Sequence, residues 1–125
     1  MNYVIEGKPL SVNNTKAAVN VRGKIRMITT AKARTWKKAA AWSLRSQRGT
    51  IPTIAGPCTL TIRVFLPTAA GDVDNYLKAI LDALQDAKVF ANDRQVQGIQ
   101  ATKAKDKDRP RVEIEVHEKA TQAQA

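Results

Sequence analysis

Two stretches of the chain place apolar residues at helical spacing. The first covers residues 30–48, where good helix formers follow Thr30, which suits an N-cap, and precede Gly49, which ends helices readily. At 100° per residue, one face of this stretch collects Ala33, Trp36, Ala39, Ala40 and Leu44. The opposite arc collects Arg34, Lys37, Lys38, Arg45 and Arg48. The pattern predicts a helix that buries one side and presents a basic stripe on the other.

The second stretch has i, i+3, i+4, i+7 spacing at Leu77, Ile80, Leu81 and Leu84. This spacing predicts an amphipathic helix from about residue 74 to about residue 87. By helical phase, Asp82 and Asp86 project to its outer side, where they are expected to be solvated surface residues.

Alternating apolar and polar residues predict extended segments between and around the helices. The segments are residues 3–5, a hairpin or arm at 21–29 with its bend at Gly23, a half-buried strand at 58–66 ended by Pro67, residues 93–104 with a bulge near Gly98, and residues 110–118. The charged stretch 103–110 between the last two segments is interpreted as a solvated hairpin loop.

This order of elements indicates an α+β domain in which a mixed sheet packs with two main helices. Residues 1–119 are predicted to form one domain and residues 120–125 a frayed tail. A chain of this size often gains stability by pairing, so a single domain, alone or as a dimer, is the starting expectation. The sequence lacks a run of about 18 uncharged apolar residues, so we expect no membrane span and a cytoplasmic location. Cys58 lies in an apolar alternating run and is expected to be buried and inert.

Charge is distributed unevenly along the chain, which has a formal net charge of +10. Residues 1–71 contain twelve Lys or Arg residues and a single acid, Glu6, whereas residues 72–125 contain nine bases and ten acids. Clustered cations neutralise phosphates and release their counterions, so the basic part suggests a nucleic-acid partner. A merely solubilising basic surface is the alternative.

The residues expected to contact DNA lie in the predicted arm and on the basic stripe. They are Arg22, Lys24, Arg26, Arg34, Lys37, Lys38, Arg45 and Arg48. Trp42 lies between the basic arc and the buried arc, where it could stack on a base. A partly buried packing role is the favoured prediction for this tryptophan.

Acidic residues gather where the second helix begins. Asp72 and Asp74 flank Val73, and Lys78 follows Asp74 by one helical turn. Two neighbouring carboxylates repel each other unless a cation neutralises them, and hard oxygen ligands suit Mg²⁺ or, as a substitute, Mn²⁺. Asp93 could supply a third ligand, and the lysine could stabilise negative charge on a phosphate.

A purely structural interpretation of the same residues also exists. Asp74 could cap the helix, with Asp72 as an incidental loop residue. Lys78 could be an ordinary i, i+4 partner of Asp74 or Asp82. The D-x-D pattern is common, and it is not an EF-hand here, because neither the required Gly nor the required Glu follows.

The run D-V-D-N-Y-x-K-A-x-x-D-A-L at residues 72–84, followed by N-D-R-Q-V at 92–96, resembles the active-site segment of the RusA-type Holliday junction resolvases of bacteria and their prophages. The resemblance extends to the strand TIRVFLP, to an S-x-N-N loop (Ser11, Asn13 and Asn14) and to the closing strand RVEIEVHE. It implies a homodimeric, Mg²⁺-dependent endonuclease that nicks four-way DNA junctions symmetrically. It also implies metal coordination by Asp72, Asp74 and Asp93, and a catalytic role for Lys78.

Two features of this sequence depart from the family pattern. The family's loop before the first aspartate is rich in arginine, and an arginine adjoins that aspartate, whereas this chain has TAAG with Gly71 in that place. Phosphate contact could pass instead to the basic residues of 22–48. Asn92 stands before Asp93, where relatives can have an acid, but Asp93 keeps its carboxylate.

The distance between the acids leaves two arrangements open. A helix over residues 74–87 is about 20 Å long, so Asp93 starts far from Asp74 unless the chain folds back or a partner subunit supplies Asp93. The resemblance, added to the basic charge and the acids, implies a Mg²⁺-dependent, structure-selective endodeoxyribonuclease that resolves Holliday junctions in recombination and repair. The alternatives are a non-catalytic basic DNA-binding protein and a metal nuclease acting on other branched nucleic acids.

Overall fold

The computed structural model describes residues 1–11, 16–68 and 71–119. The predicted tail at 120–125 and the asparagines of the S-x-N-N loop, Asn13 and Asn14, lie outside these residues. The helices are α1 (Ala31–Arg48) and α2 (Asp74–Asp86), with a short 3₁₀ turn η2 (Asp93–Gln95). The strands are β1 (Asn2–Glu6), β2 (Lys16–Val21), β3 (Lys24–Thr29), β4 (Cys58–Leu66), β5 (Val96–Lys105) and β6 (Arg111–Glu118). The α+β prediction is confirmed.

The main sheet has four strands in the order β1, β6, β4, β5. Strand β4 runs parallel to β5 and antiparallel to β6, so the sheet is mixed, as predicted. The register between β4 and β5 shifts after Cys58, which pairs with Val96, because Thr59 pairs with Gly98 and leaves one residue of β5 unopposed. This shift confirms the bulge predicted near Gly98.

The hairpin predicted between the last two strands is wrong. Strand β4 lies between β5 and β6, so residues 106–110 carry the chain across β4. The physical reason is burial: β6 buries alternate residues and takes an inner position, whereas β5 is mostly exposed and suits an edge. The crossing segment is also tied down, since Asp106 accepts hydrogen bonds from the Arg109 amide (3.0 Å) and from Arg111 (2.7 Å).

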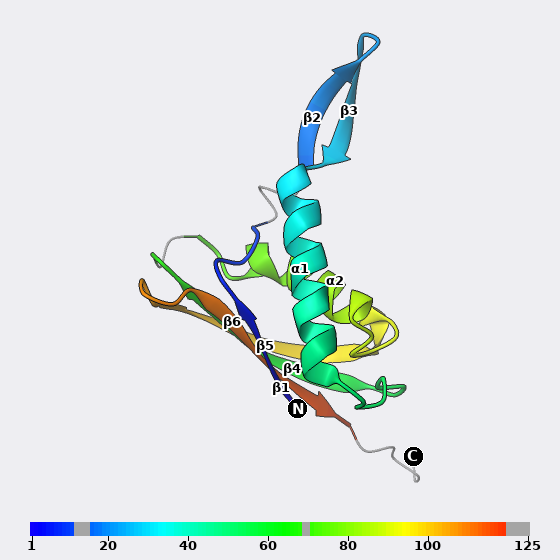
Figure 1. Ribbon diagram of the computed structural model, residues 1–125, viewed down its shortest axis with the longest axis vertical. Helices are drawn as coiled ribbons and strands as arrows, with labels where there is room; N and C mark the ends of the chain where they lie inside the picture. Colours follow the sequence, from blue (N-terminus) through cyan, green and yellow to red (C-terminus); the bar gives the residue numbers. More distant parts are fainter. Residues whose placement is uncertain (12–15, 69–70, 120–125) are drawn as a thin grey trace.

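Both helices cover one face of this sheet (Figure 1). The core between them combines side chains that are at most 3% exposed, from α1 (Ala40, Leu44), α2 (Ile80, Ala83, Leu84), β4 (Leu60, Ile62, Val64, Leu66) and β6 (Val112, Ile114, Val116). Cys58 is buried as expected, and burial raises the pKa of its thiol. Within the described parts of the chain, no helix has the length and apolarity needed to span a bilayer.

Helix α1 begins and ends where the sequence predicts. The Thr30 hydroxyl accepts a hydrogen bond from the Ala33 amide (3.1 Å), and Gly49 adopts a φ of 57° beyond the last turn. Ala33, Ala40 and Leu44 are buried, whereas Ala39 is exposed at the edge of the predicted apolar face.

Strands β2 and β3 form a separate hairpin that extends from the body in line with α1 (Figure 1). Its two-residue turn, Arg22 and Gly23, has φ values of 54° and 79°, which is the pattern of a type I′ turn. The predicted arm with its bend at Gly23 is confirmed, but its first strand begins at Lys16, before the predicted range 21–29. It carries exposed apolar residues, with Ile25 at 77% and Met27 at 63% exposure, beside its basic ones.

Candidate nuclease site and basic surface

The two acids of the D-x-D motif lie where the chain enters α2. Gly71 has a φ of 89°, and the Asp72 carbonyl accepts a hydrogen bond from the Asn75 amide (3.1 Å), which closes the turn that starts the helix. Both Asp72 and Asp74 are exposed. Within the described chain, no hydrogen bond or ion pair engages either carboxylate.

The helix-capping interpretation of Asp74 is wrong. The N-cap residue of α2 is Val73, whose φ and ψ of −62° and −33° are already helical, and no side-chain hydrogen bond caps this end. Asp74 is the first helical residue, and its carboxylate projects outward. A negative charge at this end of a helix is still favoured by the helix dipole.

Lys78 pairs with Asp82, and not with Asp74. Its ammonium lies 2.9 Å from one carboxylate oxygen of Asp82, and the other oxygen lies 3.1 Å from Lys37 of α1. The prediction that Asp82 is a solvated surface residue is wrong, because α1 packs beside α2 and places Lys37 against it; the Asp82 side chain is 27% exposed. The alternative of an i, i+4 pair between Lys78 and Asp82 is confirmed.

These contacts shift the pKa values of the pair in opposite directions. Partial burial raises the pKa of Asp82, but hydrogen bonds from Lys78 and Lys37 outweigh it and hold the pKa below its ordinary value. The hydrogen bond to Asp82 raises the pKa of Lys78, and the charge of Asp93 adds to this effect. Asp93 therefore acts electrostatically on the side of α2 that carries Lys78.

Asp93 reaches α2 because the chain folds back after the helix. Lys88 adopts a φ of 62°, and the Val89 amide donates to the Leu84 carbonyl (3.1 Å), so the chain reverses directly after Asp86. The Asp93 amide then donates to the Gln85 side chain (3.0 Å). The chain folds back after a helix that extends to Asp86, and it brings Asp93 to Gln85 near the end of α2, not to Asp74 at its start.

Two neighbours of Asp93, which the sequence did not single out as functional, fix its loop. Asn92 accepts a hydrogen bond from the Arg94 amide (2.9 Å) and Gln95 accepts one from the Asn92 amide (2.9 Å), which together form a capping box. The Gln95 amide group also donates to the carbonyls of Ile54 (2.7 Å) and Gly56 (2.9 Å). The N-x-x-Q spacing of residues 92–95 is the pattern from which this capping box could have been predicted.

Lys103 is a third residue that the sequence did not single out as functional. It lies on β5, and its ammonium donates to the carbonyl of Gly71, the residue before Asp72. Parallel strands end at the same edge of a sheet, so the end of β5 meets the loop that follows β4. A cation therefore occupies the space beside Asp72 where the family resemblance expects an arginine.

The chemistry of the two helix-start acids fits a hard divalent cation, since both offer exposed, unengaged carboxylate oxygens. Across the described ranges, however, no three His, Cys, Asp or Glu side chains lie close enough to hold one ion. Asp93 thus lies on the Lys78 side of α2 without joining Asp72 and Asp74 in a single cluster. The described chain therefore offers two neighbouring carboxylates, with Asp93 outside their cluster.

The basic residues predicted to bind DNA fall into two overlapping groups. Six are exposed: Arg22, Lys24, Arg26, Arg34, Lys38 and Arg45. Three of the basic residues join α1 to the end of α2: Lys37 pairs with Asp82, Arg45 donates to the Asp86 carbonyl (2.8 Å) and Arg48 donates to the Ala87 carbonyl (3.1 Å). The two arginines satisfy carbonyls at the C-terminus of α2 that would otherwise lack intrahelical partners.

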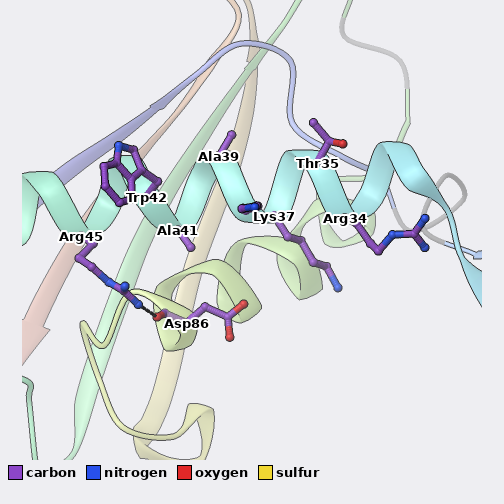
Figure 2. Close-up of a pocket in the computed structure, with 9 residues that line it drawn as sticks. Arg34, Thr35, Lys37, Ala39, Ala41, Trp42, Arg45 and Asp86 are labelled. Carbon is purple, nitrogen blue, oxygen red and sulfur yellow. Dashed lines mark hydrogen bonds between the residues drawn. The ribbon is translucent and has the colours of Figure 1, made fainter.

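The outer face of α1 is open. Trp42 is 73% exposed, so its predicted packing role is wrong; nothing in the described chain covers this side of the helix. A hollow of about 860 Å³ follows this face and includes Lys37, Lys38, Ala41, Trp42 and Arg45 in its lining. Figure 2 shows Lys37 and Arg45 reaching toward α2, whereas Trp42 lies on the part of α1 turned away from it.

An α+β fold with exposed carboxylates and a lysine on one helix, and a basic surface on the next, is suited to chemistry on phosphodiesters. Residues 6–117 match the family of endodeoxyribonuclease RusA, and the chain belongs to this family. It is also similar to YqaN, an uncharacterized protein of Bacillus subtilis (strain 168), with 25% identity over 140 residues that cover 94% of this chain and 96% of that protein.

Proposed function

We propose that this protein is a Mg²⁺-dependent, structure-selective endodeoxyribonuclease that resolves four-way DNA junctions by symmetric nicking. The supporting observation is one connected arrangement. Asp72 and Asp74 stand exposed at the start of α2, Lys78 follows one turn later, and Asp82 links Lys78 to Lys37 on the basic helix. Because the chain belongs to the RusA endodeoxyribonuclease family, the chemistry expected of these residues is cleavage of DNA.

In this proposal Asp72 and Asp74 hold the divalent ion, with Asp93 as the third ligand from the same chain or from a partner subunit. When bound, Mg²⁺, or Mn²⁺ in its place, supplies Lewis-acid activation of water and charge neutralisation. The Asp93 amide donates a hydrogen bond to the Gln85 side chain, about 16 Å along α2 from Asp74, so the same-chain route requires the loop to move along the helix. A substrate phosphate oxygen would complete the ligand set.

The lysines act on the phosphate. Lys78 is 71% exposed on its side chain, and its raised pKa keeps it fully protonated at neutral pH, so it can stabilise negative charge that develops on the scissile phosphate. Lys103, held at the Gly71 carbonyl, places a further cation beside Asp72. It would take the part of the arginine that the loop lacks.

The basic arm and α1 hold the rest of the substrate. Arg22, Lys24 and Arg26 lie on the hairpin, which has the two-stranded form that a major groove admits. A homodimer would present two such surfaces and two sites related by a two-fold axis, which matches two symmetric nicks in a junction. We assign the activity to DNA recombination and repair in the cytoplasm, including that of prophages.

A synthetic four-way junction tests this function when it is incubated with the protein with and without Mg²⁺, beside a linear duplex of the same sequence. Paired nicks at symmetric positions, only with the metal and only in the junction, are expected. Binding without product in either Mg²⁺ or Mn²⁺ would contradict the proposal and indicate a non-catalytic DNA-binding protein. Stronger cleavage of flaps or forks than of the junction would indicate a nuclease for other branched substrates.

A further inference from the structure

An exposed tryptophan stands between two cations on the outer face of α1. Trp42 lies four residues after Lys38 and three before Arg45, so the three side chains are neighbours on the helix surface. The indole is 73% exposed, the largest exposure of any aromatic side chain that the structure describes. Arg45 is held at the Asp86 carbonyl (2.8 Å), which fixes one side of this cluster.

The hollow of about 860 Å³ beside these residues has an aromatic ring, alanines, several cations and one acid, Asp86, in its lining. A flat π surface with cations at its edge suits a nucleotide, because the base can stack on the ring while phosphates meet the ammonium and guanidinium groups. Charge also argues for a polyanion, since residues 7–71 contain no Asp or Glu.

A second copy of the chain is the less favourable occupant of this face. Two-fold pairing would place Lys38 and Arg45 of one copy against the same residues of the other, and like charges that face each other are destabilising. The same cations would attract nucleic acid. We therefore consider DNA as the occupant and self-association as an outcome that the experiment must exclude.

The hollow is connected to the candidate nuclease site through one carboxylate. Lys37 lines the hollow and binds Asp82 (3.1 Å), and Asp82 in turn binds Lys78 (2.9 Å). Along α1, Trp42 lies five residues beyond Lys37, which is about 7.5 Å of axial rise and about 140° around the helix axis. A strand whose phosphate meets Lys78 reaches the Trp42 side only by passing around α1.

We propose that Trp42, between Lys38 and Arg45, is a stacking site for an unpaired base near the cut. The site then favours substrates whose bases are already unstacked at a branch point over continuous duplex. This inference rests on the proposed function for the choice of DNA as ligand, but its test needs binding and no cleavage.

The test measures affinity by fluorescence anisotropy in EDTA, with a labelled eight-nucleotide oligo(dT) and a labelled duplex at equal salt. Trp42→Ala is expected to weaken the affinity for oligo(dT) about tenfold or more and the affinity for the duplex less than about twofold. Trp42→Phe should keep most of the affinity for oligo(dT). Ile51→Ala, a matched change at another exposed apolar side chain, should alter neither ligand. Equal losses on both DNAs, or no loss, would overturn the proposal.

Two further readouts separate stacking from charge and from dimerisation. In a Trp36→Phe background, where Trp42 is the remaining tryptophan, oligo(dT) should quench its emission and inorganic polyphosphate should not. Sedimentation should give the same oligomeric state for wild type and Trp42→Ala; a change of state would identify the face as an interface between copies and overturn the assignment. If junction cleavage fails but these results hold, the proposed nuclease function fails alone.

Discussion

Lys78 donates a hydrogen bond to Asp82, one turn further along α2, and leaves Asp74 unpaired one turn before it. This choice of partner separates the functions of three acids that look alike in the sequence. Asp82 positions lysines, since it holds both Lys78 and Lys37. Asp72 and Asp74 remain available for a cation.

The substitution Asp82→Asn should release both lysines. We expect a loss of stability on the order of 1 kcal/mol or less at neutral pH, because the Lys78 side of the pair is solvated. The rate of junction cleavage should fall by more than this small loss of stability explains, since Lys78 would no longer be held beside the candidate site. Equal cleavage by the variant and the wild type would contradict a positioning role.

The pH dependence of this stability difference follows from the direction of the pKa shifts. The pKa of folded Asp82 lies below its ordinary 3.8, so its contribution is present above that pH and is lost as the pH falls through the folded pKa. The pKa of Lys78 lies above its ordinary 10.5, so its contribution is present below that pH and is lost as the pH rises through the folded pKa. Urea denaturation of the wild type and of Asp82→Asn should therefore give the full difference at pH 5 to 9, and this difference should shrink as the pH falls below 3.8.

Gln95→Ala should destabilise the loop that carries Asp93. The side chain makes hydrogen bonds to the backbone at Ala91, Asn92, Ile54 and Gly56, so their loss should cost about 2–4 kcal/mol in the free energy of unfolding. Urea denaturation measures this cost. The matched variant Gln100→Ala, at an exposed position of β5, should change stability by less than about 0.5 kcal/mol. Similar values for the two variants would contradict the role of Gln95.

Lys38→Ala should weaken DNA binding without unfolding the protein, because Lys38 is exposed on α1. If it contacts a phosphate, the slope of log K against log salt should decrease by about one unit. A salt titration of junction affinity in EDTA measures this slope. Lys107→Ala, which removes the same charge from the exposed turn between β5 and β6, should leave the slope unchanged. Equal slopes for wild type and Lys38→Ala would refute the phosphate contact.

Lys103→Ala tests whether this lysine replaces the arginine that the loop lacks. The variant loses the contact with the Gly71 carbonyl, and we expect junction cleavage to fall about tenfold or more because the position of Asp72 is less well fixed. Lys105→Ala, two residues further along the same exposed strand, serves as the control. The idea fails if both variants cleave at the wild-type rate.

Local patterns in the sequence predicted the elements well, because their signals are local. Thr30 and Gly49 mark the ends of α1, and the alternation from Cys58 to Leu66 marks β4. The order of strands depends on pairing between distant segments, so the sequence suggested a β5–β6 hairpin where β4 in fact intervenes. A periodic pattern shows which positions are apolar, but not which strand becomes the neighbour.

The sequence predicted which residue types form the candidate site, but it did not predict which side chains contact one another there. Helical phase placed Asp82 away from the apolar stripe of α2, yet it could not show that α1 brings Lys37 to the same point. In the same way, Trp42 was expected to pack against the protein. It is exposed because no described element covers its side of α1, which the sequence of the helix alone could not show. The fold-back that takes Asp93 to Gln85 depends on a positive φ at Lys88. Glycine is the residue that usually marks such a turn in a sequence, and this position has a lysine instead.

The most direct test of the central claim is nick mapping on a synthetic four-way junction in Mg²⁺, with wild type, Asp74→Asn and the control Asp108→Asn. Asp108 is an exposed acid in the turn before β6, far along the chain from the candidate site. We predict symmetric nicks with wild type and Asp108→Asn, and binding without nicks with Asp74→Asn. Wild-type nicking by Asp74→Asn would contradict the assignment of a metal-dependent nuclease site to the start of α2.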